Sequence, residues 1–191
     1  AKEKLDESFQ TALSGPSRDF KESSSNTSQA LILALILIYL VLAAQFESFT
    51  DPFIIMITVP LAIAGALLSL WTLDQTLNIF SQIGIIMLIG LVTKNGILIV
   101  EFANKKRETG LAIKEAVLEA ATQRLRPILM TSLATALGAL PIAISLGAAA
   151  TSRKALGTVV VGGLLFSLVL TLFVIPSVYT YLSSKHKKQI D

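Results

Sequence analysis

The sequence predicts an all-α membrane protein with five transmembrane helices and a short cytoplasmic amphipathic helix. Of its 191 residues, 53% are hydrophobic and 15% are charged, which is far more apolar than a soluble domain of this length usually is. The apolar residues also gather into five charge-free runs, each near or above the roughly 18–20 residues that cross a bilayer. These runs cover residues 23–46, 52–73, 75–93, 127–152 and 155–184.

The runs also predict how the chain is divided. Residues 1–26 are polar and mixed in charge, and we expect them to be a periplasmic remnant and linker, the last strip of a further domain. Residues 27–184 form the predicted transmembrane bundle, and residues 185–191 a cytoplasmic basic tail. An amphipathic stretch at about 109–123 predicts a short surface helix between two spans. The five predicted spans cover about 27–46, 52–73, 77–104, 127–147 and 155–182.

The distribution of basic residues predicts the orientation of these spans. The connector between the fourth and fifth spans has only Arg153 and Lys154, whereas the connector between the third and fourth has six basic residues. These six are Lys105, Lys106, Arg107, Lys114, Arg124 and Arg126. Because short cytoplasmic loops carry the excess of Lys and Arg, residues 105–126 and the C-terminus are predicted to be cytoplasmic, and the N-terminus periplasmic.

Several function classes have no support in the sequence. The net charge of +3 comes from basic residues beside membrane spans, not from a basic patch interleaved with aromatics, so we expect the lipid bilayer and not a nucleic acid as partner. There is no cysteine, which excludes disulfides and thiolate metal sites. No nucleotide-binding loop of the form GxxxxGK[ST] is present, so an ATPase has no support. An intramembrane protease would need a His-Glu metal pair or a membrane serine with a nearby base, and neither is present, so we expect no catalytic residue and no metal site.

The most informative single residue is Lys94, because no other charge occurs between Asp74 and Glu101. An ionisable side chain at the middle of a membrane helix costs about 2.5–3.5 kcal/mol on insertion scales, so it is normally kept only where it faces a partner or a water-filled path. Snorkelling to the interface is the alternative. The seven residues to Glu101 correspond to about 10.5 Å of helix rise, a depth that disfavours snorkelling.

Several strings of residues resemble one known family. They are LSGPSRDFKESS (13–24), LAAQFESFTDPFIIMITVPLAIAGALL (42–68), GLVTKNGILIVEFA (90–103), RLRPILMTSLA (124–134) and GALP (138–141). In order and spacing they resemble the resistance–nodulation–cell division (RND) superfamily of proton-driven efflux transporters, specifically its hydrophobe/amphiphile efflux branch. The resemblance covers essentially the whole chain and equates its five spans with spans 8–12 of such a transporter, the C-terminal transmembrane portion.

The resemblance implies more than the residues alone could. Members of this family are trimers of twelve-span inner-membrane subunits that work with a periplasmic adaptor and an outer-membrane channel. They expel amphiphilic small molecules, driven by the proton motive force and not by a bound cofactor. A lysine, an arginine and a threonine of the family relay protons together with two aspartates of the fourth span, and the three positions fall on Lys94, Arg124 and Thr131. This chain has no such aspartates, so we expect it to be inactive alone.

Alternatives stay open for these residues and for the chain. Asn95 either supports the relay or merely packs the helix. Thr131 could bond its hydroxyl to a preceding carbonyl, as membrane threonines often do, and Arg124 could simply anchor a cytoplasmic helix end. The whole chain could also be a non-transporting membrane scaffold or accessory subunit, in which Lys94 pairs with an intramembrane acid of a partner protein.

Overall fold

The computed structural model describes residues 16–145 and 150–186, and within them all regular structure is helical. The helices are α1 (Pro16–Phe46), α2 (Thr50–Met56), α3 (Thr58–Thr72), α4 (Ile79–Glu108), α5 (Ile113–Ala143) and α6 (Ala150–His186). Five stretches of this part are long and apolar enough to cross a membrane: Gln29–Phe46, Thr50–Thr72, Ile79–Glu108, Ile113–Ala143 and Arg153–Ser183. The predicted all-α class and its five spans are therefore confirmed.

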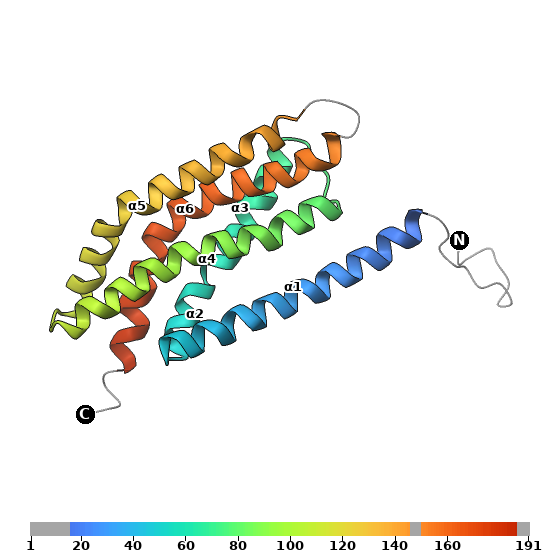
Figure 1. Ribbon diagram of the computed structural model, residues 1–191. Coiled ribbons are helices and arrows are strands. Elements are labelled where there is room, and N and C mark those ends of the chain that lie inside the picture. The colour runs from blue at the N-terminus through green and yellow to red at the C-terminus, as the bar shows by residue number, and fades with distance from the viewer. Residues whose placement is uncertain (1–15, 146–149, 187–191) are drawn as a thin grey trace, which may run out of the picture.

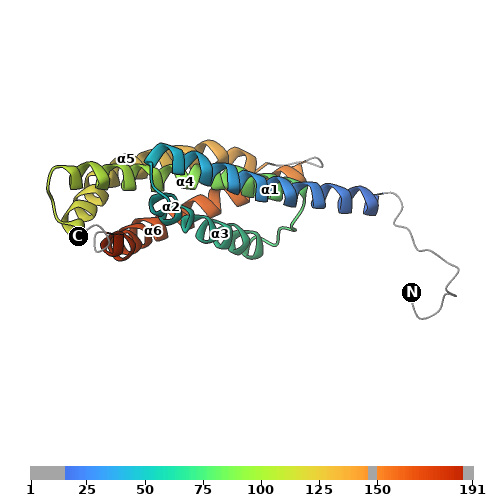
Figure 2. The same cartoon turned by 90° about the horizontal axis from the view of Figure 1, so that it is seen from below.

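Helix α6 is the element around which the others pack, since it contacts α2, α3, α4 and α5 (Figures 1 and 2). Helix α1 differs, because among the described elements it contacts only α2 and α4. Its apolar side chains stay largely uncovered, with Leu33 58% and Val41 62% exposed. Such a helix, apolar on all sides, suits contact with lipid or with protein outside the described residues.

Two glycines of α6 explain its close packing. A Cβ atom at Gly163 would lie 2.3 Å from Leu88 of α4, and one at Gly157 would lie 2.3 Å from the backbone nitrogen of Ala143 in α5. Small residues at such positions let membrane helices approach closely and gain van der Waals contact. These glycines therefore mark two places where α6 packs closely against its neighbours.

Helix α1 begins earlier than the sequence predicts. Residues 1–26 were predicted to form a linker before a span at 27–46, but the helix starts at Pro16 and continues to Phe46. Proline suits the first turn of a helix, because its missing N–H lies among the groups that have no intrahelical partner anyway. The helix therefore extends through the polar residues. Residues 1–15 and 187–191, which belong to the predicted N-terminal segment and basic tail, lie outside the described residues.

The second predicted span, at 52–73, is interrupted. It consists of α2 and α3, which separate at Ile57. Pro60 has no N–H to donate to the carbonyl of Met56, so the regular hydrogen-bond pattern cannot continue across this point. Just after the break, the hydroxyl of Thr58 donates to the carbonyl of Ile55 at 2.7 Å.

The predicted surface helix at 109–123 and the fourth span at 127–147 are not separate. Both belong to α5, which runs from Ile113 to Ala143 with Pro127 inside it. Proline within a helix removes one backbone hydrogen bond and bends the helix without always ending it. The α5 ribbon changes direction partway along its length in Figure 1. The amphipathic stretch is thus the first part of a bent helix.

Candidate functional site

The helix that carries Lys94 is fixed at both ends by its own sequence. At the start of α4 the side chain of Asn78 accepts a hydrogen bond from the backbone N–H of Ser81 at 2.9 Å, and the Ser81 hydroxyl accepts one from the N–H of Asn78 at 2.8 Å. This capping box satisfies two of the N–H groups that a helix start leaves free. The last turn is basic, which suits the negative end of the helix dipole.

Lys94 lies near the middle of α4 and its side chain is exposed at the surface of the bundle. Its neighbours on the helix, Thr93 and Asn95, are both buried. Among the residues that the structure describes, no acidic side chain forms an ion pair with Lys94. The Lys94 amine therefore lies on an open face of the bundle, near the middle of a helix that is long and apolar enough to cross a membrane.

A buried hydrogen bond joins α4 to α5 immediately beside Lys94. The amide of Asn95 donates to the hydroxyl of Ser132 at 3.1 Å, and the two residues are 4% and 3% exposed. A polar pair in apolar surroundings is specific for one alignment, because a shift of either helix would leave buried groups without partners. The bond therefore fixes the height and rotation of α4 against α5 at this level.

The same bond places Thr131 on the side of the helix pair that carries Lys94. Helices α4 and α5 lie side by side and run in opposite directions (Figure 1). Lys94 precedes Asn95, and Thr131 precedes Ser132. In an antiparallel pair, stepping back one residue from two facing positions rotates both side chains by about 100° toward the same side. Thr131 is exposed like Lys94, and its hydroxyl donates to the carbonyls of Pro127 at 3.0 Å and Ile128 at 3.2 Å.

Arg124 lies about two turns before Thr131 in α5, toward the end of the bundle where α4 ends. Its guanidinium stacks 4.6 Å from the centre of the Phe102 ring. The Nε atom of Arg124 is buried without a hydrogen-bond partner among the described residues, and the ring face gives the guanidinium a cation–π contact. The structure thus brings Lys94 and Thr131 to one level, and Arg124 together with Phe102 to another.

A second polar cluster, which the sequence analysis did not find, lies at the same end of the bundle. Arg107 donates to the Tyr179 hydroxyl at 3.2 Å and to the Ser183 hydroxyl at 2.6 Å. Tyr179, which is fully buried, donates to Asn104, and the Asn104 amide donates to Asp51 at 2.8 Å. We call Arg107, Tyr179, Asn104 and Asp51 the polar chain. All its hydrogen bonds point from the cation toward the carboxylate.

Sequence reasoning missed these residues because their partners are distant in the chain. Tyr179 and Asn104 are 75 positions apart, and Ser132 is 37 positions from Asn95. A signal did exist for Asn95, since a buried amide in a membrane helix needs a partner.

A family model described as the AcrB/AcrD/AcrF family matches residues 1–183. The chain belongs to this family. The predicted resemblance to RND efflux transporters is thereby confirmed. Together with the five apolar helices, family membership supports a multi-pass protein of the inner membrane.

Individual relatives agree with the family assignment. An uncharacterized transporter of Haemophilus influenzae is 43% identical over 194 residues, which cover 98% of this chain and 19% of the relative. The multidrug resistance protein MdtC of Erwinia amylovora is 40% identical, and that of Erwinia tasmaniensis 39%, each over 182 residues that cover 95% of this chain and 18% of the relative. The chain therefore spans about one fifth of the length of these relatives.

Proposed function

We propose that the chain is the C-terminal membrane portion of a proton-driven efflux transporter that exchanges protons for amphiphilic small molecules, including drugs. Family membership, relatives named as multidrug resistance proteins and five membrane-spanning stretches support this proposal. The proton motive force would drive transport, with no cofactor. As the resemblance implies, the complete protein would be a homotrimer that works with a periplasmic adaptor and an outer-membrane channel.

The observation that carries the proposal is the open face around Lys94. Lys94 and Thr131 lie on the same side of α4 and α5 at one level, and the buried Asn95–Ser132 bond fixes that level. An amine in such a position pairs with carboxylates while they are charged. When a carboxylate takes up a proton it loses its attraction for the amine, and the helices that carry the two groups can shift. Arg124 would guide protons toward this site from the end of α4.

The carboxylates of this relay would have to come from outside the described residues. Glu101, the acidic residue nearest to Lys94 in the sequence, forms an ion pair with Lys105 at 3.0 Å, and Asp51 belongs to the polar chain. For this reason we propose that the chain does not transport by itself, and that the complete transporter supplies both the acids and the substrate-binding domains.

The test is substrate efflux by the complete transporter with Lys94→Ala. Loss of one partner of an intramembrane ion pair should reduce proton-coupled efflux by about tenfold or more, equivalent to at least about 1.4 kcal/mol of coupling. Lys105→Ala, which removes an exposed amine of the same helix, serves as the matched control and should leave efflux nearly unchanged. Undiminished efflux by the Lys94→Ala transporter would refute the relay role.

The proposed orientation, with a periplasmic N-terminus and a cytoplasmic C-terminus, can be tested separately. Because the chain has no cysteine, single cysteines can be placed at Gly110, after α4, and at Asp74, before it. A membrane-impermeant maleimide added to intact cells should label the Asp74 position after outer-membrane permeabilisation and spare the Gly110 position. The reverse pattern would invert the topology.

A second candidate is a scaffold or accessory subunit that uses Lys94 only for assembly. The same exposed amine favours it, since a partner protein's intramembrane acid could fill the same role. The two candidates differ in one measurement. Lys94→Ala should abolish efflux but preserve assembly in the transporter, whereas in a scaffold it should abolish co-purification with the acidic partner.

A further inference from the structure

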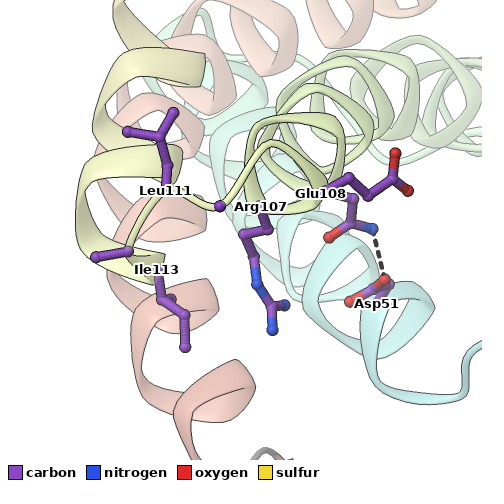
Figure 3. Close-up of a pocket in the computed structure, with 8 residues that line it drawn as sticks. Asp51, Arg107, Glu108, Leu111 and Ile113 are labelled. Carbon is purple, nitrogen blue, oxygen red and sulfur yellow. Dashed lines mark hydrogen bonds between the residues drawn. The ribbon is translucent and has the colours of Figure 1, made fainter.

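A polar pocket of about 630 Å³ opens at the end of the bundle where α4 passes into α5 (Figure 3). Its walls come from the start of α2, the end of α4 and the residues that lead into α5. The charged and polar side chains that line it are Asp51, Asn104, Arg107 and Glu108, and apolar Leu111 and Ile113 lie on its α5 side. We propose that this pocket binds the phosphoethanolamine headgroup of a membrane phospholipid.

The pocket presents charges of opposite sign that do not neutralise each other by contact. Arg107 and Asp51 form no direct ion pair, and the polar chain through Tyr179 and Asn104 links them instead. Arg107 uses only its Nη1 atom in these bonds, which leaves the Nη2 and Nε donors for a ligand. Asp51 accepts from Asn104 through Oδ2, which leaves Oδ1.

The polar chain also holds these groups in place before any ligand binds. Tyr179 is fully buried and is bonded on both sides, so neither Arg107 nor Asn104 can turn away without losing a hydrogen bond. Aligned hydrogen bonds polarise one another, which strengthens a chain that runs from a cation to an anion. Binding sites that are already ordered lose less conformational entropy when a ligand arrives.

The charges define the chemistry of the ligand. Arginine donors match phosphate oxygens, and a primary ammonium group donates up to three hydrogen bonds, here to Asp51 and Glu108. A simple anion would be repelled by the two carboxylates, and a simple cation by Arg107. A group with a phosphate next to a primary ammonium satisfies both sides. Choline fits less well, because its trimethylated nitrogen has no N–H to donate.

The position of the pocket favours a lipid as the source of this group. The pocket lies where two of the stretches that are apolar enough to cross a membrane end, α4 and the stretch before α2. Phe49, just before α2, is 77% exposed and offers an apolar side chain for contact with lipid. Leu111 and Ile113 can contact the apolar part of a lipid whose headgroup enters the pocket.

The proposal can be tested by native mass spectrometry of the complete, delipidated protein. The delipidated protein is incubated with equal amounts of phosphatidylethanolamine, phosphatidylcholine and phosphatidylglycerol. We expect phosphatidylethanolamine to be retained several-fold more than the other two. Arg107→Gln should lower its retention. Asp51→Asn should reduce the preference over phosphatidylcholine, because it keeps an oxygen that accepts from Asn104 and removes only the charge.

Controls separate a site from general attraction to lipid. Lys105→Gln removes an exposed charge of the same helix outside the pocket and should change retention little. Equal retention of the three lipids, or equal losses in the Lys105 and Arg107 variants, would overturn the proposal. Displacement of the lipid by an equal concentration of free O-phosphoethanolamine would assign the pocket to a soluble ligand and overturn the lipid assignment. If Arg107→Gln does not fold, Asp51→Asn decides alone.

Discussion

Two cations on α4, Lys94 and Arg107, have opposite surroundings. They are 13 residues apart, about 20 Å along the helix axis. Arg107, at the end of the helix, is bonded to Tyr179 and Ser183 of α6 and stacks 5.9 Å from the Tyr179 ring. Lys94, at the middle, is exposed and forms no ion pair among the described residues.

The difference shows which charges the chain satisfies by itself. At the end of the bundle, polar side chains from α2, α4 and α6 meet and stabilise one another, so this charge contributes to the fold. Near the middle of α4, the described part of the chain offers the Lys94 amine an open face and no acidic partner. A charge in lipid is costly without a partner, and the missing ion pair of Lys94 among the described residues is therefore the basis of the relay proposal.

Replacing each cation with leucine should therefore have opposite effects. The change at Lys94 should favour the membrane-inserted state of α4, whereas the change at Arg107 should destabilise the folded bundle. Lys94→Leu should favour membrane insertion of the α4 segment by about 3 kcal/mol, the difference between the two residues at a helix centre. Arg107→Leu should destabilise the bundle by about 2–3 kcal/mol, because Tyr179 and Ser183 lose a charged donor. Insertion assays on α4 and unfolding of the bundle in bicelles measure these effects. Destabilisation by Lys94→Leu of the size expected for Arg107→Leu would show that Lys94 does have an internal partner.

Removing the Tyr179 hydroxyl should show how much the polar chain contributes to stability at the Arg107 end of α4. Tyr179→Phe keeps the buried ring but interrupts the chain between Arg107 and Asn104, so we expect a loss of about 2 kcal/mol in the free energy of unfolding. A double-mutant cycle between Arg107→Gln and Asp51→Asn should show coupling with Tyr179 and none with Phe at this position. Coupling that persists without the hydroxyl would mean that the two charges interact directly.

Removal of the Asn95–Ser132 hydrogen bond, beside Lys94, should have a smaller effect on stability. Ser132→Ala leaves the buried Asn95 amide without its partner, and we expect about 1 kcal/mol of destabilisation, near the upper part of the range for such bonds in membrane proteins. Efflux by the complete transporter should fall more than the loss of folded protein alone would cause, because α4 and α5 lose their fixed alignment at the level of Lys94 and Thr131. Ser132→Thr, which keeps the hydroxyl, should restore part of the efflux.

The smallest effect is expected at the ion pair between Lys105 and Glu101. Both side chains are substantially exposed, and the pair spans one helical turn, so Lys105→Ala should change stability by no more than about 0.5 kcal/mol. The same unfolding assay measures it. A larger loss would show that exposed charges near the end of α4 contribute to the fold as Arg107 does.

Much of the fold could be predicted from sequence because each span is a local property. Runs of apolar residues longer than a bilayer crossing specify helices in lipid, whatever they pack against. The break at Ile57 and the continuity of α5 could not be predicted with the same rule. Pro60 lies beside the break between α2 and α3, whereas Pro127 lies inside a continuous α5, and the apolar length of a span does not distinguish the two cases.

The sequence by itself determined the number of spans and singled out Lys94, because apolar length and an isolated charge are visible without any partner. Only the tertiary structure decided which residues meet: Asn95 with Ser132, Tyr179 with Asn104 and Arg124 with Phe102. The physical reason is that burial in a membrane is set by residue type along a helix. A hydrogen bond between helices depends on their relative rotation and height, which no single helix contains.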